Sequence, residues 1–522
     1  MIPPERRFDA ALLALATLGS GGLSLLLGQD FNVDQLHYHF YLGWSLVADR
    51  LDHDIAPAGI GTYLNPVLHV PTYLGIACLP PRVFGFLLGA VHGLNAFLAY
   101  RLAVHVLEGR RWKQGLALAA GLVAAVGPSA VGLLGTTFGD NLASLPALTA
   151  LLLLVGGATT NQSAHVSGSR GVLVGALAGA ATGLKLTLAV FHVALAGAVA
   201  ALALRTRSVR LVLAFALGSL LGGLASGGYW ALQLWERFGN PAFPMANAVF
   251  HSPYHETTNL TDSRWRARGV RDLWVAPVDM AIGDTSRFQE VPFRDPRYLV
   301  LLVVTAGTVI GGLLRRRLAG PRDSLASILV LAYWWTAYVV WLSVFCYYRY
   351  FALGEFVAPV AIVASLTLLA APRWLAPVWL SLALAIALGS TAPSWGRMRW
   401  SDSWYRVRLP RMAEARDAAV IVDATCVSFV LPAFPPGTRF LGLAQLGGLR
   451  PLIVKELRAH SGPIFRLARF DQPLSELDSL GLSDPGDCEI VKTRGHRLGL
   501  CRLVRTSSSR PSPELGPVSR QP

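Results

Sequence analysis

Two aspartates near the amino terminus are the first residues whose spacing suggests chemistry. Asp30 and Asp34 lie four residues apart, directly after the apolar stretch 10–28. On a helix, side chains at positions i and i+4 share one face, where two like charges destabilise each other. A partly desolvated carboxylate beside a second one has a raised pKa, which suits a general base. The alternative interpretation is that these polar residues only mark the end of an apolar helix.

Histidines and a tyrosine follow the aspartate pair as candidate ligands. His37, Tyr38 and His39 lie in the same loop, which also contains His53, His69, Asp49, Asp52 and Asp54. We group the first three with Glu355, much further along the chain, as candidate acceptor contacts. Mixed sets of aspartate and histidine can bind a divalent cation, but the spacing here matches no recognised metal motif. The sequence therefore requires no cofactor and leaves a divalent cation as an open alternative.

Three further ionisable residues lie beside apolar segments, where charges are costly and often functional. Asp140 opens an apolar stretch, and it is either a catalytic residue or an ordinary helix N-cap. Lys185 interrupts a long apolar run, and Arg349 lies in an aromatic stretch. Each of these two cations either binds an anion such as a phosphate or extends its side chain to the membrane interface.

The composition indicates that membrane spans position these residues. Only 15% of the 522 residues are charged and 53% are hydrophobic, whereas an average soluble protein has about 25% charged residues. The net charge of +15 comes mostly from basic residues between the apolar segments. No recognised nucleic-acid-binding motif accompanies this charge. The sequence therefore predicts an integral membrane protein with no nucleic-acid partner.

The apolar segments predict an all-α polytopic membrane protein with about eleven transmembrane helices, since about twenty apolar residues cross a bilayer core. The segments are 10–28, 83–107, 115–134, 141–157, 171–204, 211–232, 298–314, 325–345, 355–371 and 374–391. The run 171–204 counts as two helices. As one helix it would be about 51 Å long, against a hydrocarbon thickness of about 30 Å.

The basic residues assign sides to the loops. If the run 171–204 turns near Thr182-Gly183, every short basic segment from Arg6 to Arg373 falls on one side, as the positive-inside rule requires. The N-terminus is then cytoplasmic, and the C-terminal region is extracytoplasmic. All the candidate residues named above face outward in this topology. The first outer loop is expected to hold interfacial helices, since it mixes aromatic residues with prolines.

The chain divides into two domains and a tail. Residues 1–391 form the transmembrane module, which includes the outer loops 29–82 and 233–297. Residues 392–505 are expected to form a small extracytoplasmic α/β domain, because short apolar runs bounded by turn residues predict buried strands. Residues 506–522 are rich in Ser and Pro and are predicted to be a disordered tail.

Two cysteines of the C-terminal domain are candidates for a disulfide. A hairpin with its turn at Arg494-Gly495 would place Cys488 opposite Cys501 as a non-hydrogen-bonded pair. The Cα atoms of such a pair lie about 4.5 Å apart, and disulfides accept Cα separations from about 4.4 Å. The alternative is two unlinked cysteines on neighbouring strands. An oxidising outer compartment favours the disulfide.

In order and placement, these motifs resemble those of the GT-C superfamily of membrane glycosyltransferases, which use sugars linked to lipid phosphates. Asp30-Phe-Asn-Val-Asp34 is similar to the acidic motif of the superfamily's first outer loop. Phe138-Gly-Asp-Asn141 is similar to its second acidic position. Gly183-Leu-Lys-Leu-Thr187 looks like the small-residue-Lys element that some members carry near the donor phosphate. Tyr348-Arg-Tyr-Phe-Ala-Leu-Gly-Glu355 resembles an Arg-Tyr element before a late span.

The resemblance implies an inverting enzyme of the bacterial inner membrane that uses a polyprenyl-phosphate-sugar donor. The acceptor would be a hydroxyl of a cell-envelope glycan, a glycolipid or a protein. Asp34 is expected to be the general base, with Asp30 as the second choice, and Asp140 would orient the acceptor or a metal ion. Lys185 and Arg349 would bind the donor phosphate, because cations stabilise the charge of this leaving group.

Two other classes of protein compete with the enzyme. A polytopic transporter or lipid flippase would carry charged residues in the middle of its spans, whereas the sequence places most charges in loops. A non-catalytic scaffold that presents the C-terminal domain would leave the aspartate pair without a purpose. The sequence therefore favours the glycosyltransferase over both.

Overall fold

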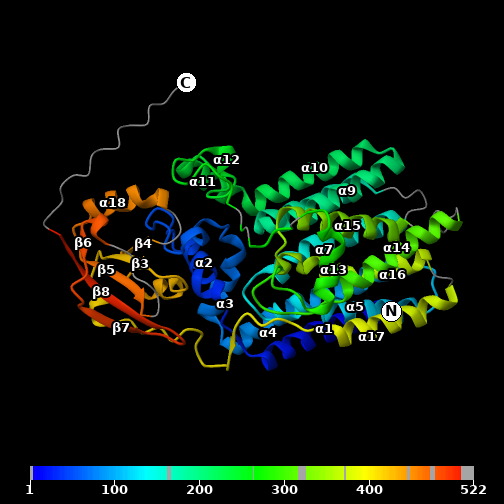
Figure 1. Ribbon diagram of the computed structural model, residues 1–522, viewed down its shortest axis with the longest axis horizontal. Coiled ribbons are helices and arrows are strands. Elements are labelled where there is room, and N and C mark those ends of the chain that lie inside the picture. Colours follow the sequence, from blue (N-terminus) through cyan, green and yellow to red (C-terminus); the bar gives the residue numbers. More distant parts are fainter. Residues whose placement is uncertain are drawn as a thin grey trace, which may run out of the picture.

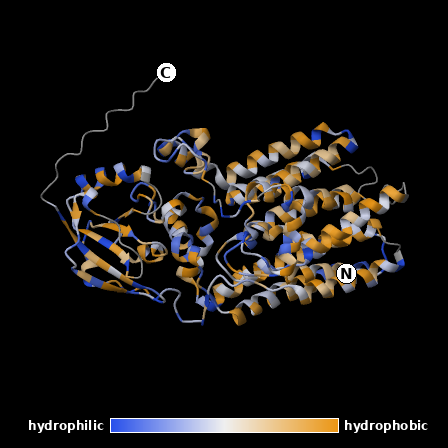
Figure 2. Cartoon of the chain, in the orientation of Figure 1, coloured by the Kyte–Doolittle hydropathy of each residue, from blue (hydrophilic) through white to orange (hydrophobic). Residues whose placement is uncertain are grey.

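The computed structural model describes residues 4–160, 166–260, 262, 264–267, 269–315, 325–369, 372–443, 447–470 and 477–506. A bundle of apolar helices lies beside a smaller domain that contains a β-sheet (Figure 1). Hydrophobic residues dominate the helices of the bundle, whereas the sheet domain has mixed hydropathy (Figure 2). The predicted fold class, an all-α membrane module with a small α/β C-terminal domain, is confirmed.

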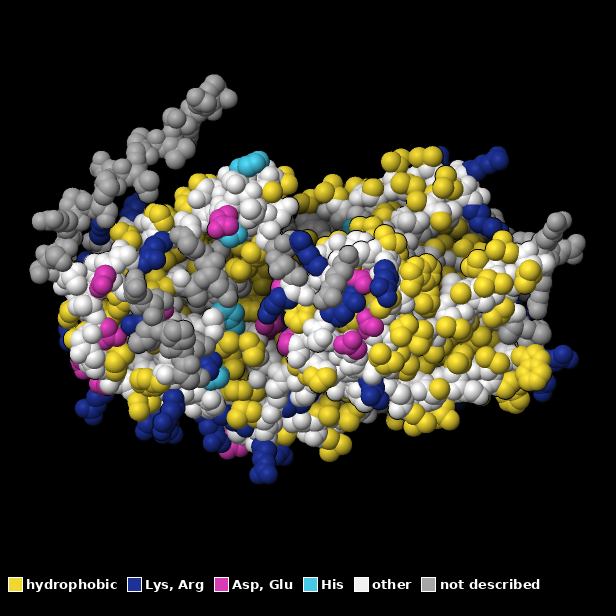
Figure 3. All heavy atoms as spheres, in the orientation of Figure 1, with side chains coloured by type: hydrophobic (Ala, Val, Ile, Leu, Met, Phe, Trp, Pro, Cys, Tyr) yellow, Lys and Arg dark blue, Asp and Glu magenta, His cyan; other side chains and the backbone are white. Residues whose placement is uncertain are grey.

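Eight helices of the described chain are long and apolar enough to cross a membrane. They belong to α1 (Pro4–Leu27), α4 (Pro81–Val106), α7 (Asp140–Thr160), α9 (Ala189–Thr206), α10 (Val209–Gly223) with α11 (Tyr229–Phe238), α14 (Arg297–Arg315), α15 (Leu325–Val344) and α16 (Ala352–Leu369). Hydrophobic side chains cover the flank of the bundle, and Lys and Arg side chains lie at its end remote from the sheet domain (Figure 3).

Three of the expected spans are shorter helices. They are α5 (Lys113–Ala125), α8 (Gly168–Leu184) and α17 (Pro372–Gly389). The 13 residues of α5 extend for about 20 Å, less than the hydrocarbon thickness of about 30 Å. The expected span 115–134 is interrupted at Gly127-Pro128, where the short helix α6 (Pro128–Gly132) begins. Glycine followed by proline favours such a break, because proline is well tolerated in the first turn of a helix and disfavoured in its interior.

The long apolar run forms two helices, as predicted, but the break lies at Lys185 rather than at Thr182-Gly183. Helix α8 ends at Leu184, and Lys185 has an extended backbone with φ −146° and ψ 107°. A 3-10 turn, Leu186–Leu188, then leads into α9. The ammonium group of Lys185 lies 2.6 Å from the carboxylate of Asp140. Helix α8 thus ends just before a partly buried cation that is paired with a carboxylate of α7.

Helix α8 packs closely against α10 through glycines. A Cβ atom at Gly175 or Gly179 would collide with the backbone of α10, and one at Gly218 or Gly222 would collide with the backbone of α8. Small residues let two membrane helices approach in this way. The two helices thereby form a compact wall beside Lys185.

The C-terminal sheet has the strand order β4 (Arg439–Gly442), β3 (Ala419–Asp423), β5 (Ile464–Arg469), β8 (Arg497–Arg505) and β6 (Leu482–Ser483). Strand β7 (Cys488–Lys492) also pairs with β8. Strand β3 is parallel to both of its neighbours. Helix α18 (Arg450–Ala459) covers one face, where Ile453 and Leu457 pack with Ile421 and Leu441.

The other face of the sheet packs against the first outer loop. Helix α2 (Phe40–Val47) is almost completely buried, and Phe40 and Trp44 share a hydrophobic core with Val420 and Phe440. The loop that contains α2 and α3 (Val70–Cys78) therefore does not simply rest on a membrane surface. The remaining loop helices are α12 (Asn247–Phe250) and α13 (Asp272–Ile282).

A two-stranded sheet and buried polar contacts join the two domains. Strand β1 (Gln29–Asp30) pairs with β2 (Arg397–Met398). Arg50 donates hydrogen bonds to the backbone carbonyls of Pro436 and Thr438. The loop 29–82, which the sequence assigned to the transmembrane module, is thus packed together with the C-terminal domain.

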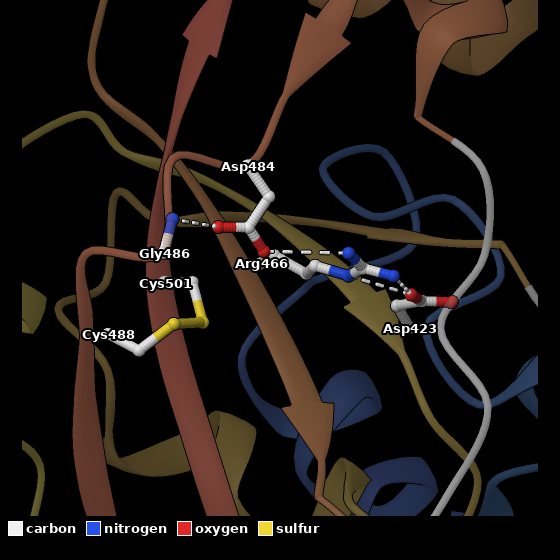
Figure 4. Close-up of a disulfide and its surroundings, with 6 residues drawn as sticks. All are labelled: Asp423, Arg466, Asp484, Gly486, Cys488 and Cys501. Atoms are coloured by element: carbon white, nitrogen blue, oxygen red, sulfur yellow. Dashed lines mark hydrogen bonds and ion pairs between the residues drawn. A yellow bond between two sulfur atoms is a disulfide. The ribbon is translucent and has the colours of Figure 1, made fainter.

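Cys488 and Cys501 form a disulfide between β7 and β8 (Figure 4). Their Cα atoms lie 3.9 Å apart, and the two residues are paired in the register expected from the turn at Arg494-Gly495. Beside the disulfide, Arg466 donates a hydrogen bond of 2.8 Å from Nε to Asp423. The predicted disordered tail, apart from its first residue, lies outside the described residues.

We expect alkylation to distinguish two bonded cysteines from three free ones. If the unreduced protein is unfolded with thiols protected from exchange, only Cys78, Cys346 and Cys426 should react, because Cys488 and Cys501 are bonded to each other. Mass spectrometry should therefore detect three labelled cysteines before reduction and five after it. Five labelled cysteines in protein from an oxidising compartment, without reduction, would contradict the pairing.

Candidate active site

A turn at residues 135–140, between α6 and α7, organises the site. Gly135 has φ +72° and Gly139 has φ +78°, conformations that favour glycine. A Cβ atom at Gly135 would collide with the side chain of Ser24, and one at Gly139 would lie 2.9 Å from Leu68. Both glycines are therefore needed for the close approach of this turn to the surrounding helices.

Asp30 binds the turn from the end of α1. Its carboxylate accepts hydrogen bonds from the backbone N–H of Thr137 at 2.8 Å, from the Thr137 hydroxyl at 2.9 Å and from the Asn32 amide at 2.8 and 2.9 Å. Burial raises the pKa of Asp30, and these hydrogen bonds oppose the rise. Asp30 is fully buried. Its hydrogen bonds to Thr137 join the first outer loop to the turn.

Asp34, by contrast, reaches a cavity. It directly precedes the π-helical turn Gln35–His39, and 23% of its side chain is exposed. Its Oδ2 atom accepts a hydrogen bond of 2.9 Å from the guanidinium group of Arg349. The guanidinium carbon of Arg349 lies 4.0 Å from the ring centre of Phe138, a cation–π contact. Of the two candidate bases, Asp34 is therefore the one that lines a cavity.

Lys185 binds the same turn from its other side. Its Nζ atom lies 2.6 Å from Oδ1 of Asp140 and donates a hydrogen bond of 3.0 Å to the carbonyl of Phe138. Asp140 is the first residue of α7. Phe138 of the turn thus contacts two cations. Lys185 donates to its backbone carbonyl, and Arg349 lies over its aromatic ring.

Two cavities meet at these cations. We call the first the loop cavity: it has a volume of about 660 Å³, and Asp34, Asp262, Arg264, Glu290 and Arg349 are its charged residues. The second, which we call the span cavity, has a volume of about 530 Å³ and lies among α8, α9, α10 and α11. Its charged residues are Lys185 and Arg349, and much of its wall is apolar. Tyr38, Phe138, Arg349 and Tyr350 line both cavities.

A stacked pair of histidines lines the span cavity. The ring centres of His39 and His69 lie 4.4 Å apart with an angle of 14° between the planes. Both side chains are buried, and the Nδ1 atom of each has no hydrogen-bond partner. Burial lowers the pKa of His39 well below its usual value, and His69 and Lys185 lower it further. Burial also lowers the pKa of His69 to about 3. Both imidazoles are therefore neutral at pH 7.

The neighbouring candidates have different positions. Tyr38 lines both cavities, and burial raises its pKa, which Asp34 raises further, so that its hydroxyl stays protonated. His37 contacts the C-terminal domain, where its Nδ1 atom accepts a hydrogen bond of 3.1 Å from the backbone N–H of Cys426. His37 lines neither of the two cavities.

Glu355, the fourth candidate acceptor contact, lies away from both cavities. Its side chain is fully buried. Its two carboxylate oxygens accept hydrogen bonds of 2.9 Å from the backbone N–H groups of Ser129 and Ala130, at the start of α6. A carboxylate satisfies the free N–H groups at a helix start. Glu355 therefore holds α6 in place.

The described residues bring together one group of Asp, Glu, His or Cys close enough to share a metal ion. It consists of Asp484, Cys488 and Cys501, and the two cysteines form the disulfide. Among the described residues, Asp34, Asp140 and the histidines do not form a group close enough to share a metal ion. The open alternative of a divalent cation at the site stays a prediction.

No known protein family and no curated protein matches the sequence significantly. The structure resembles the crystal structure of ArnT from Cupriavidus metallidurans bound to undecaprenyl phosphate, with a TM-score of 0.52 and 13% sequence identity. The similarity covers 96% of this chain and 98% of that chain. The chain has a GT-C fold. The resemblance expected from the order of the motifs is thus confirmed for the fold, and identity this low assigns no role to a residue.

Within this GT-C fold, the residues chosen from the sequence divide into two groups. Asp34, Asp140, Lys185 and Arg349 gather at the turn as two ion pairs, while Asp30 supports the turn from behind. Sequence reasoning missed the cavity residues that come from distant loops, Trp265, Glu290 and Trp395. The length of the outer loop 233–297 is the sequence feature that points to the first two, because long loops are often functional.

We expect the lack of space around Gly135 to make its alanine variant less stable than the alanine variant of an uncrowded glycine. Gly135→Ala and Gly109→Ala both place a side chain at a left-handed φ, which costs about 1–2 kcal/mol. Gly109 has open space around it, whereas a Cβ at Gly135 collides with Ser24 and adds about 1–3 kcal/mol of overpacking. Thermal unfolding in lipid nanodiscs should therefore show the larger loss for Gly135→Ala. Equal losses would mean that the turn has room to move.

Proposed function

We propose that this protein is a glycosyltransferase that moves a sugar from a polyprenyl-phosphate donor to an acceptor hydroxyl. The observation that carries the proposal is the meeting of two cavities of different chemistry at Arg349. One cavity is apolar and cationic, and the other contains the carboxylate of Asp34. A transfer between a lipid-linked phosphate and a polar acceptor needs both environments within reach of one reacting carbon.

The span cavity suits the donor. Its lining includes the cations Lys185 and Arg349 but no carboxylate, so it favours an anion, and its apolar walls suit a prenyl chain. His39 and His69 are neutral, so they can offer N–H groups to phosphate oxygens without adding charge. The similarity to a structure of ArnT bound to undecaprenyl phosphate supports this choice of donor.

In the proposed reaction, Asp34 accepts the proton of the acceptor hydroxyl as its oxygen attacks the anomeric carbon. The bond from this carbon to the phosphate oxygen breaks, and the phosphate keeps the electron pair. Lys185 and Arg349 stabilise the negative charge of this leaving group. A single displacement inverts the anomeric configuration. The proton ends on Asp34, whose role is that of a general base.

Asp140 has a supporting part in this proposal. Its carboxylate pairs with Lys185 at 2.6 Å and offsets part of the cost of burying the ammonium group. This contact holds Lys185 at the carbonyl of Phe138, where it faces the span cavity. Asp140 does not line either of the two cavities, so we assign it the positioning of the phosphate-binding lysine.

The reaction is proposed to take place on the outer face of the bacterial inner membrane. The C-terminal domain lies at one end of the bundle, and the N-terminus lies toward the other end (Figure 1). Both cavities are lined by residues of the first outer loop, which packs against the C-terminal domain. The basic segments of the short loops favour a cytoplasmic location for the end toward the N-terminus. A transporter gains no support, because the fully buried Arg297 and Glu355 lie in the first turns of α14 and α16 rather than in mid-span.

Two aspartate variants test the proposed base. Asp34→Asn removes the proton acceptor and should lower transfer by roughly a hundredfold to ten-thousandfold. Its amide oxygen can still accept the hydrogen bond of Arg349, so we expect a folded protein with a lower melting temperature, because the buried guanidinium loses its counter-charge. Asp30→Asn disturbs the buried contacts to Thr137 and should cost about 1–3 kcal/mol of stability while the folded protein stays active. The assay follows labelled sugar from polyprenyl-phosphate donors to cell-envelope glycan, glycolipid and protein acceptors, with the purified full chain in nanodiscs.

The comparison of the two variants decides the assignment. Full activity in Asp34→Asn would show that this carboxylate is not the base. Inactive but well-folded Asp30→Asn together with active Asp34→Asn would transfer the role to Asp30. A wild-type protein that transfers no sugar from any of these donors would contradict the glycosyltransferase itself.

A further inference from the structure

We propose that the loop cavity binds the acceptor as a carbohydrate without phosphate or carboxylate groups of its own. This inference rests on the proposed function and names the class of acceptor. It is carried by two features of the cavity, its aromatic walls and its balance of charges, which differ from those of the span cavity.

Aromatic rings form much of the wall of the loop cavity. Trp265 lies against Tyr347 with ring centres 5.3 Å apart, and Trp395 lies against Phe138 at 5.7 Å. All four rings line the cavity. The face of an aromatic ring carries partial negative charge, so it attracts the weakly positive C–H groups of a sugar ring and also attracts cations. Such walls suit a neutral or an amine-bearing sugar.

Each described cation that lines the loop cavity is paired with a carboxylate that lines the same cavity. Arg349 is paired with Asp34 at 2.9 Å, and Arg264 is paired with Asp262 at 2.6 Å. A phosphate or carboxylate entering the cavity would have to compete with these carboxylates for the guanidinium groups. In the span cavity, Lys185 and Arg349 are paired as well, with Asp140 and Asp34. Neither of these carboxylates lines that cavity, so it is the better anion site.

Glu290 adds a third carboxylate to the cavity. Both of its oxygens accept the hydroxyl hydrogen bond of Tyr347, at 2.9 Å each. Among the described residues, three carboxylates and two guanidinium groups line the cavity, so their formal charges sum to −1. This charge repels an anion and favours an amine. Carboxylate oxygens also accept hydrogen bonds from sugar hydroxyls, and about 660 Å³ is within the usual size of a small-molecule site.

Direct binding of three related sugars tests the inference. The probes are chitobiose, which carries amines, its neutral N,N′-diacetyl form and the 6-phosphate of that form. We expect the full-length protein in nanodiscs to bind the first two at least tenfold more tightly than the phosphate, measured by calorimetry. Trp265→Ala should lower the affinity for the amine-bearing probe and for the neutral probe by tenfold or more. Trp274→Ala, an exposed tryptophan of α13 outside both cavities, is the matched control.

A charge variant makes the test sharper. Glu290→Gln keeps the shape of the side chain but removes one negative charge from the cavity. This variant should reduce the difference in affinity between the neutral probe and its 6-phosphate. It should also bind the amine-bearing probe more weakly, while its affinity for the neutral probe should change little. A merely structural role of Glu290 would shift all three affinities alike.

The outcomes separate this inference from the proposed function. Tightest binding of the 6-phosphate, equal binding by Trp265→Ala and Trp274→Ala, or no binding of any probe at millimolar concentration would overturn the inference. Binding of the neutral and amine-bearing probes by a protein that transfers no sugar would overturn only the proposed function. Transfer to an acceptor whose anionic group is required would overturn only the inference.

Discussion

The contacts around the turn at residues 135–140 are the constraint on which the site depends. Its backbone and side chains bind three segments that are far apart in the sequence. Asp30 holds the end of α1 to Thr137, Lys185 reaches the carbonyl of Phe138 from the break between α8 and α9, and Arg349 lies over the Phe138 ring. Two glycines allow the close approach. The turn therefore sets the distance between the cations and the carboxylate of Asp34.

This arrangement explains which parts of the site could be predicted from the sequence. The order of apolar segments and the positions of basic residues were sufficient to place Asp34, Asp140, Lys185 and Arg349 at one end of the bundle. The choice between Asp30 and Asp34 could not be made, because both are carboxylates in one short loop. Only the contact between Asp30 and Thr137, 107 positions away, separates a buried structural residue from one that faces a cavity.

The remaining differences also come from tertiary contacts that leave no local signal. The aromatic residues of α2 read as an interfacial helix, but they complete the core of the C-terminal domain. Glu355 resembled a site residue because it follows an Arg-Tyr element, yet it binds a helix start created by the break at Gly127-Pro128. The break after α8 came at Lys185, which is paired with a carboxylate of α7. The periodicity and composition of a sequence predict its helices well, but they do not predict which distant residues these side chains contact.

In the reaction that we propose, one turn places a phosphate site and a base on either side of a reacting carbon. The most direct test is a structure of the protein with a non-hydrolysable polyprenyl-phosphate sugar analogue. The account predicts phosphate oxygens within about 2.7–3.2 Å of the side-chain nitrogens of Lys185 and Arg349, with the anomeric carbon facing Asp34 where the two cavities meet. A phosphate bound away from both cations, or a sugar that faces away from Asp34, would contradict it.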